Sequence, residues 1–319
     1  MNDTSDRVWD VIVVGGGASG LSAGLMLARA RRSVMVIDAG EPRNAPAAAV
    51  HGLFGLEGTP PTELLARGRD EVQRYGGQIR LGAVAAVTRN DELFDATLTD
   101  GSTVRARRLL IATGLVDELP DIPGVAQLWG RDVLHCPYCH GWEVRDRAIG
   151  VLATSPMAVH QTLLFHQWSR DVRLFINGQQ LEAADRAKLD ALGIPVVEGS
   201  IASLKITDDR LDGVRLDDGT FVDLDAAVVG PRMVARVAPF AALGIEPTEH
   251  PMGSFIASDE FGRTAVPGVW VAGNATELSA QVGAAAAAGA LAAAHINADL
   301  VIQDADRAVA AMAGAGSVA

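Results

Sequence analysis

A glycine-rich run near the N-terminus constrains this fold more than any other feature of the chain. The apolar segment Asp10–Val14 leads into Gly-Gly-Gly-Ala-Ser-Gly, and the helix-favouring segment Leu21–Ala30 follows at once. In such a run Gly15 permits a tight turn, Gly17 lets a pyrophosphate approach the backbone, and Gly20 allows close packing of helix against strand. We therefore expect strand, turn and helix, with the helix N-terminus aimed at a phosphate.

A second apolar segment strengthens this interpretation. Ser33–Ile37 has the composition of a buried strand and ends in Asp38, where an acidic side chain can accept hydrogen bonds from a ribose hydroxyl. A glycine turn that binds nothing is the alternative. The motif alone leaves open whether the ligand is FAD or NAD. The residues predicted to contact the dinucleotide here are Gly15, Gly17, Ala18, Ser19, Gly20, Asp38 and Ala39.

Charge and hydropathy exclude several classes of partner. The 319 residues carry a formal net charge of -12, which disfavours binding to nucleic acid or to an anionic membrane surface. The first ten residues lack the pattern of a secretory signal, so we expect a cytoplasmic protein. The Ala-rich stretch Val282–Ile296 reads as a closely packed soluble helix, too short to span a bilayer.

The chain contains only two cysteines, and they form a Cys-x-x-Cys pair, Cys136 and Cys139, around Pro137. Four interpretations compete. A zinc site would draw on the flanking His135 and His140, but four ligands within six residues would strain a tetrahedron. Two inert thiols need no such spacing, and a thioredoxin-like exchange module would need a fold that the surrounding sequence does not predict. A disulfide coupled to a flavin fits best, and we expect no bound metal.

Two later segments, each an apolar strand ending in a glycine turn, carry a resemblance to a known family. Leu109–Gly114 and Val266–Asn274, together with the first turn, resemble the FAD domain of the thioredoxin-reductase family. The resemblance implies FAD as the cofactor. It departs at Asn274, where the family usually has Asp, so that contact would be neutral. The further FAD contacts that it implies are Arg43, Asn44, Ala112, Thr113, Gly114, Gly273, Asn274, Gln281 and Val282.

The same resemblance assigns roles at the redox pair. Cys139 would face the flavin and Cys136 would exchange with the substrate. His140 stands where thioredoxin reductases have an acidic residue, and an imidazole can take a proton from an incoming thiol near neutral pH. A surface turn residue is the alternative for His140.

The family's second glycine turn, which binds NADPH, is missing. After the strand Ala148–Ala153 the turn reads Thr-Ser-Pro-Met-Ala, and Asn177–Gln180 follows the next strand without an arginine pair. Pro156 has no N–H, and the bulkier residues block close approach of a pyrophosphate. A divergent but working nicotinamide site is the alternative.

We expect an α/β fold of two Rossmann-like domains, the second inserted in the first. The FAD-binding domain would comprise residues 1–116 and 240–319, and the smaller NAD(P)-binding-like domain, residues 117–239, would carry the cysteine pair and not bind NADPH. Hairpins are predicted around Asp100-Gly101 and Asp218-Gly219, and the tail beyond Asp304 is predicted to fray.

The sequence Cys-Pro-Tyr-Cys-His-Gly and the lost nicotinamide turn most resemble the FAD-dependent dithiol oxidases, which close disulfides in natural products such as gliotoxin, holomycin and romidepsin. The resemblance implies a small-molecule dithiol substrate, O2 as acceptor, H2O2 as product and a homodimer. Alternatives are a thioredoxin or disulfide reductase using NADPH or ferredoxin, and a flavin-based redox sensor. Leu53, Phe54, Tyr138 and Trp142 could line the substrate pocket, although burial in the core is the simpler expectation.

Overall fold

The computed structural model describes residues 7–316, which form two compact units. The first comprises residues up to Arg43, Thr62–Val116 and the chain from Val234 onward; the second comprises Asn44–Pro61 and Asp117–Met233. Residues 44–61, which the sequence analysis placed in the FAD-binding domain, thus group with the second unit. Both units have the alternating strand and helix pattern of the expected α/β fold.

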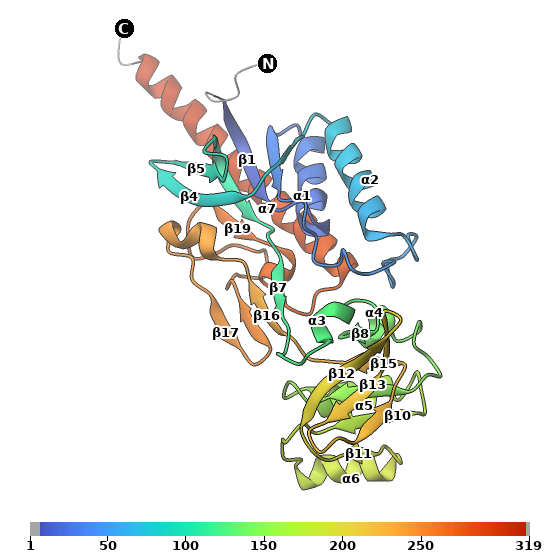
Figure 1. The fold of residues 1–319 in the computed structure, drawn as a ribbon. Helices are drawn as coiled ribbons and strands as arrows, with labels where there is room; N and C mark the ends of the chain where they lie inside the picture. The colour runs from blue at the N-terminus through green and yellow to red at the C-terminus, as the bar shows by residue number, and fades with distance from the viewer. Residues whose placement is uncertain (1–6, 317–319) are drawn as a thin grey trace. The chain divides into compact units, whose positions relative to one another are not determined.

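The first unit is built on a seven-stranded sheet, of which six strands are drawn in blue to green and β19 in orange in Figure 1. Its strand order is β3-β2-β1-β6-β5-β4, and β19 pairs with the second half of β6. The strands β3, β2, β1, β6 and β19 run parallel, whereas β4 and β5 are antiparallel. The bounds are β1 Val8–Val14, α1 Ala18–Arg29, β2 Val34–Asp38, α2 Pro61–Arg74, β3 Gln78–Leu81, β4 Val84–Asn90, β5 Leu93–Leu98, β6 Thr103–Ile111, β19 Val269–Val271 and α7 Val282–Gly316.

Short elements complete the first unit and connect it to the second. The strands form a four-stranded sheet in the order β17-β18-β16-β7. The bounds are β7 Leu115–Glu118, β16 Arg232–Ala235, η1 Ala238–Leu243, β17 Thr248–His250, β18 Gly253–Phe255 and η2 Gly273–Ala275.

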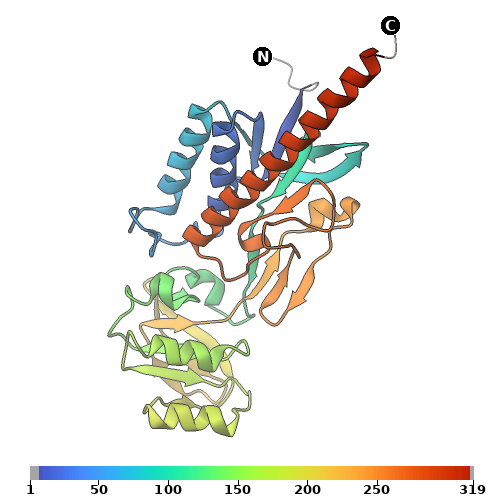
Figure 2. The same cartoon turned by 180° about the vertical axis from the view of Figure 1, so that it is seen from behind.

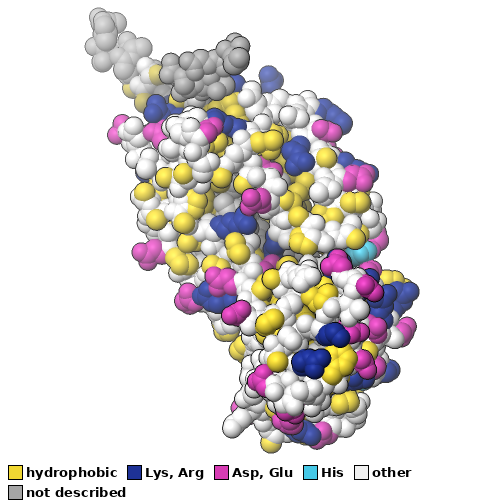
Figure 3. All heavy atoms as spheres, in the orientation of Figure 1, with side chains coloured by type: hydrophobic (Ala, Val, Ile, Leu, Met, Phe, Trp, Pro, Cys, Tyr) yellow, Lys and Arg dark blue, Asp and Glu magenta, His cyan; other side chains and the backbone are white. Residues whose placement is uncertain are grey.

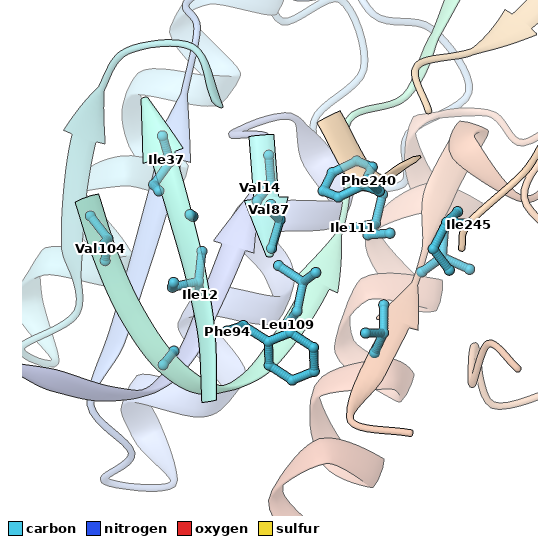
Figure 4. Packing of buried hydrophobic residues seen from close by; sticks show 14 of the residues in the cluster. Ile12, Val14, Ile37, Val87, Phe94, Val104, Leu109, Ile111, Phe240 and Ile245 are labelled. Carbon is cyan, nitrogen blue, oxygen red and sulfur yellow. The ribbon is translucent and has the colours of Figure 1, made fainter. Parts of the chain in front are cut away.

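Apolar side chains fill both faces of the large sheet because its parallel strands alternate inward and outward positions between covering layers. On one face Ile12, Leu109 and Ile111 pack with Phe94 and Phe240 (Figure 4). On the other, Val11, Val13 and Leu110 pack against α1 and α7. The glycine turn that follows β1 therefore starts from a rigid edge.

The second unit repeats the plan on a smaller scale. Its parallel sheet has the order β11-β10-β9-β15-β8, and a three-stranded antiparallel sheet, β12-β13-β14, lies in the same unit. The bounds are α3 Val125–Leu128, β8 Val133–Leu134, α4 Pro137–His140, β9 Ile149–Leu152, α5 Ala158–Phe165, β10 Val172–Phe175, α6 Ala183–Ala191, β11 Val196–Val197, β12 Ile201–Thr207, β13 Arg210–Leu216, β14 Phe221–Asp223 and β15 Ala226–Val228. Both predicted hairpins are confirmed, as β5-β6 and β13-β14.

The prediction of a frayed tail was wrong. Helix α7 continues unbroken to Gly316, and Figure 2 shows it running along the first unit. Asp304 anchors it through hydrogen bonds from Arg32 (2.6 Å) and Arg107, which also lower the pKa of that carboxyl group. Arg307 donates to Glu92 at 2.7 Å, one turn further on. Alanine is the strongest helix former, so an Ala-rich segment needs few such contacts to stay helical.

Helix α7 is also long and apolar enough, by length and composition, to cross a membrane. The sequence analysis judged only its first half and found it too short, whereas the helix has 35 residues. A packed helix of a soluble protein passes the same test, and α7 packs closely on α1, where a Cβ on Gly289 would overlap the Ser19 carbonyl.

On the face drawn in Figure 3, basic and acidic side chains are interspersed.

Candidate active site

The first glycine turn is packed so closely that two of its glycines leave no room for a side chain. Gly15 has φ +111°, a conformation that side chains rarely allow, and a Cβ on it would overlap the Ala112 carbonyl at the end of β6. A Cβ on Gly20 would overlap the Gly15 carbonyl. The turn therefore folds back onto the strand end and brings α1 directly against it, as the sequence predicts.

Gly17 and Ser19 differ from these packed positions. A Cβ on Gly17 would have no neighbour within 4 Å, although its backbone is extended and would accept one. No side chain caps α1 at Gly17, and Leu21 makes the first helical hydrogen bond back to Gly17 O (2.9 Å). The hydroxyl of Ser19 is buried and has no hydrogen-bond partner among the described residues. Free amides, an open approach and an orphaned hydroxyl at one helix N-terminus fit a pyrophosphate.

Asp38 is fixed beside this turn. It ends β2, is 9% exposed, and accepts a hydrogen bond from Gly40 N at 3.1 Å, while Arg69 lies 3.7 Å from its other oxygen. A Cβ on Gly16 would overlap the Asp38 carboxylate. The ribose acceptor therefore lies next to the phosphate turn. Ala39 and Arg43 follow it on the connection beyond β2, and their contacts with FAD remain predictions.

Three strand ends meet at this edge. Ala112 N donates to Val14 O (2.8 Å) and Ala272 N donates to Ile111 O (2.9 Å), so the ends of β1, β6 and β19 lie side by side. A Cβ on Gly273 would lie 2.8 Å from Ser19 Cβ. The structure thus brings together three segments, around residues 14, 112 and 272, that are far apart in sequence. These residues fit FAD and would hold its pyrophosphate and ribose.

The remaining predicted FAD contacts have local features of their own. Thr113 donates its hydroxyl hydrogen to Arg236 O at 3.2 Å, and Gly114 has φ +65°. Gln281 accepts from Ala285 N (2.8 Å) through its backbone carbonyl and so begins α7 just before Val282. Asn44 begins the segment that groups with the second unit. Contacts of these residues with FAD stay predictions.

Asn274, which replaces the family's usual Asp, has a structural role that Asp could not fill. The two N–H groups of its amide nitrogen are shared among three carbonyls, those of Glu277 (3.0 Å), Leu278 (3.3 Å) and Ala280 (2.9 Å). These carbonyls form the turn that leads into α7. A carboxylate only accepts hydrogen bonds, so an Asp oxygen at this position would lie against three carbonyl oxygens with no hydrogen to share.

We expect Asn274→Asp to destabilise the first unit and to weaken FAD binding. The hydrogen bonds that the amide donates are lost and a negative charge is placed against carbonyl oxygens, which should lower the free energy of unfolding by roughly 1–3 kcal/mol. Thermal unfolding of the holoprotein, with release of flavin fluorescence as a second signal, measures the effect. Asn90→Asp, an exposed change at the end of β4, is the matched control. Equal stability of the two variants would contradict this role.

The redox pair lies in the second unit, in a tight turn after β8. Cys136 and Cys139 form a disulfide with their Cα atoms 5.3 Å apart. Cys136 is extended and precedes the four-residue helix α4, and its carbonyl accepts hydrogen bonds from Cys139 N and His140 N, both at 3.2 Å. A Cβ on Gly141 would lie 2.8 Å from the Trp168 ring, so a larger residue would not fit here without a shift. Within residues 7–316 no cluster of three or more His, Cys, Asp or Glu could hold a metal.

His140 follows the pair and is largely withdrawn from solvent. Burial lowers its pKa, an effect that nearby His51 reinforces and Glu143 opposes. Its Nδ1 atom is buried without a hydrogen-bond partner among the described residues. Such a neutral imidazole, one residue from a disulfide, can accept a proton from a thiol. His135, on the other side, has its Nδ1 3.1 Å from both Val229 O and Gln161 Nε2.

The turn after β9 is closed by the chain's own side chains. Ser155 Oγ accepts from Met157 N at 3.3 Å, and Thr154 exchanges hydrogen bonds with the backbone of Gly230. From beyond β10, Gln179 donates to Ala153 O at 2.6 Å. A Cβ on Gly230 would overlap Ser155 Oγ. Ser155 thus takes up the amide of Met157, which precedes α5, and the Thr154 and Gln179 side chains tie the turn to neighbouring backbone, in contrast to the open approach at Gly17.

The sequence analysis missed three residues near His140. His51 contacts Glu57 (2.6 Å) and Glu143 (3.5 Å), although residues 51 and 143 are far apart in the chain. No local pattern marks this pairing. The expectation that the aromatic residues are core was wrong, because Phe54, Tyr138 and Trp142 are exposed in the described structure. Their part in a substrate pocket, and that of Leu53, stays a prediction.

Comparisons with known proteins agree with this architecture. Residues 9–293 match the family model described as pyridine nucleotide-disulphide oxidoreductase. The chain is 33% identical over 285 residues to a protein named thioredoxin reductase tcpT from Claviceps purpurea (85% of this chain, 88% of that protein). It is 31% identical over 312 residues to thioredoxin reductase sirT from Leptosphaeria maculans (92% and 95%). The crystal structure of HlmI is similar, with 46% identity, a TM-score of 0.92 and full coverage of both chains.

Proposed function

The chain belongs to the pyridine nucleotide-disulphide oxidoreductase family, and we propose that within it the protein is an FAD-dependent dithiol oxidase that closes a disulfide in a small molecule. The protein is an FAD-binding thiol/disulfide oxidoreductase of the thioredoxin-reductase-like type. A cytoplasmic location and a homodimer are part of the proposal.

One contrast carries the proposal. The turn at Gly17 has an open approach and an orphaned Ser19 hydroxyl. At the equivalent turn after β9, Ser155 binds the Met157 amide, Pro156 has no N–H to offer, and Gln179 binds the Ala153 carbonyl. The first arrangement suits a dinucleotide and the second disfavours one. An enzyme that binds FAD but not NADPH would draw electrons from its dithiol substrate. This supports an oxidase over an NADPH-dependent reductase.

The redox turn can perform the exchange with the groups that it holds. A substrate thiolate attacks Cys136 sulfur; the Cys136–Cys139 bond breaks, and a mixed disulfide forms while Cys139 leaves as a thiolate. The second substrate thiolate then attacks the substrate sulfur of that bond and releases Cys136. The product leaves with its new S–S bond, and the enzyme keeps two electrons as a dithiol. His140 takes a proton from an incoming thiol.

Bound FAD would supply an acceptor for the two electrons of the Cys136–Cys139 dithiol and a donor to O2, so that the overall reaction converts a dithiol and O2 into a disulfide and H2O2. Exposed Tyr138 and Trp142, on either side of Cys139, give the exchange site an apolar surface. Tyr138 packs edge-on against Trp168 at 5.9 Å and Arg145 covers the Trp142 ring at 4.1 Å, so both rings are held in place. Such a surface suits a compact organic dithiol.

Anaerobic mixing with either electron donor tests the proposal. A small dithiol such as dithiothreitol should bleach the flavin absorbance, NADPH should not, and admitting air should restore the colour with about one H2O2 per dithiol. Rapid bleaching by NADPH would contradict the oxidase and favour a reductase. Slow turnover with every dithiol, accompanied by a conformational change on reduction, would favour a redox sensor instead.

A further inference from the structure

The segment between Val50 and Thr59 in the second unit is folded so as to present one histidine. Val50 N donates to Thr59 O (2.8 Å) and Gly58 N donates to Val50 O (3.0 Å), which closes the segment into a loop. Glu57 reaches back across this loop with both carboxylate oxygens. One lies 2.6 Å from His51 Nδ1 and the other accepts from Gly52 N at 2.8 Å. The His51 ring is therefore fixed on one side.

The other side of the His51 ring faces the redox turn. Its Nε2 lies 3.5 Å from a carboxylate oxygen of Glu143. Carboxylates only accept hydrogen bonds, so the doubly protonated, positively charged ring is the form that matches both neighbours. The hydrogen bond from His51 also lowers the pKa of Glu57. Two acidic residues, separated by 86 positions in the sequence, thus contact one imidazole ring.

Glu143 in turn adjoins His140. Its amide N–H donates to the His140 carbonyl at 3.2 Å, which places it one turn after the histidine. His51 and Glu143 act on His140 with opposite sign: the first lowers its pKa and the second raises it, beside the larger lowering that burial causes. On α5, which packs against α4, His160 is exposed and His166, just beyond the helix, contacts Arg170 (2.9 Å).

We propose that His51, clamped by Glu57, is a positioning residue of the redox turn, which orients Glu143 and balances the charge around His140. The importance of His140 rests on the proposed dithiol exchange, but the network itself does not. The arrangement explains why a loop that joins β2 to α2 groups with the second unit: its half-buried His51 contacts the segment that follows the cysteines. It also gives His140, whose Nδ1 has no hydrogen-bond partner within residues 7–316, an electrostatic environment set by two side chains.

The test uses the holoenzyme and follows His140 directly. With 13C-labelled histidine, the Cε1–H signal of His140 is assigned from its absence in His140→Gln and titrated by NMR in each variant. His51→Gln should move the titration to higher pH because a positive charge is removed, whereas Glu143→Gln should move it to lower pH because a negative charge is removed. Glu57→Gln should act in the direction of His51→Gln, and should add nothing in a His51→Gln background.

A rate measurement gives the functional counterpart. If neutral His140 accepts the thiol proton, anaerobic bleaching by dithiothreitol rises with pH through the His140 titration. On the acid side, His51→Gln should slow bleaching about threefold and Glu143→Gln should accelerate it about threefold, with rates at high pH changed little. His160→Gln, an exposed histidine of the same unit, is the control and should leave both curves in place.

The outcomes separate the network from the proposed function. The network would be overturned if His51→Gln and Glu143→Gln displaced the His140 titration in the same direction. It would also be overturned if neither variant displaced that titration. Opposite displacements without a matching change in the rate would uphold the network and remove His140 from the exchange. Glu57→Gln serves as a second variant in case His51→Gln misfolds, because Glu57 is exposed and its substitution should preserve the fold.

Discussion

A Cys136→Ser variant is expected to stay yellow and to lose dithiol-driven bleaching of its flavin by at least about 10³-fold. Loss of a covalent catalyst removes the whole exchange path, and the contribution of such groups is commonly of this order or larger. The glycine turn that would hold FAD lies in the other unit and does not depend on the cysteine. Stopped-flow absorbance under nitrogen, with a protein-to-flavin ratio measured beforehand, gives both quantities.

The chain offers a clean comparison, because it has no third cysteine. In Cys139→Ser, Cys136 remains and should be trapped as a stable mixed disulfide with a thiol reagent such as 5,5′-dithiobis(2-nitrobenzoate), releasing one thionitrobenzoate per chain. In Cys136→Ser the remaining Cys139 should react more slowly, if it faces the flavin. Equal reactivity of the two single thiols would contradict the division of roles, and dithiol turnover in either variant would contradict the disulfide mechanism.

The parts of the fold that sequence could predict are those that local chemistry dictates. A strand that ends at Gly15 must turn, because its φ of +111° suits glycine alone, and the helix that follows must start where the chain next becomes apolar and helix-favouring. The Asp100-Gly101 and Asp218-Gly219 turns fix their hairpins in the same way. The cysteine pair was equally visible, since its chemistry depends on spacing alone.

Other features depend on contacts between distant segments and leave no local trace. His51 and Glu143 are joined only by tertiary folding, and nothing near residue 51 marks it. The three carbonyls that bind Asn274 belong to a loop whose course no periodicity specifies. The tail was predicted to fray because it lacks an apolar face, whereas ion pairs of Asp304 anchor it. The exposed rings of Tyr138 and Trp142 show that an aromatic near a redox pair need not be core.

Gly17→Ala and Gly20→Ala, three residues apart in the same turn, are expected to fail in different ways. At Gly17 the backbone is extended and an added Cβ meets nothing, so the apoprotein should be as stable as wild type or slightly more so. The new methyl group would, however, occupy the approach to the free amides of α1. Loss of one charge-assisted hydrogen bond costs about 1.5–3 kcal/mol, which is roughly 10- to 100-fold in the Kd of FAD.

Gly20→Ala places its methyl group on the Gly15 carbonyl oxygen, which can move only if the backbone of the turn shifts. Overpacking of this kind typically costs about 1–3 kcal/mol of stability, so both the apoprotein and its affinity for FAD should suffer. Calorimetric unfolding of the two apoproteins and fluorescence titration with FAD separate stability from binding. If Gly17→Ala bound FAD with wild-type affinity, the pyrophosphate could not lie over this turn. The assignment of the FAD site to this edge of the first unit would then be wrong.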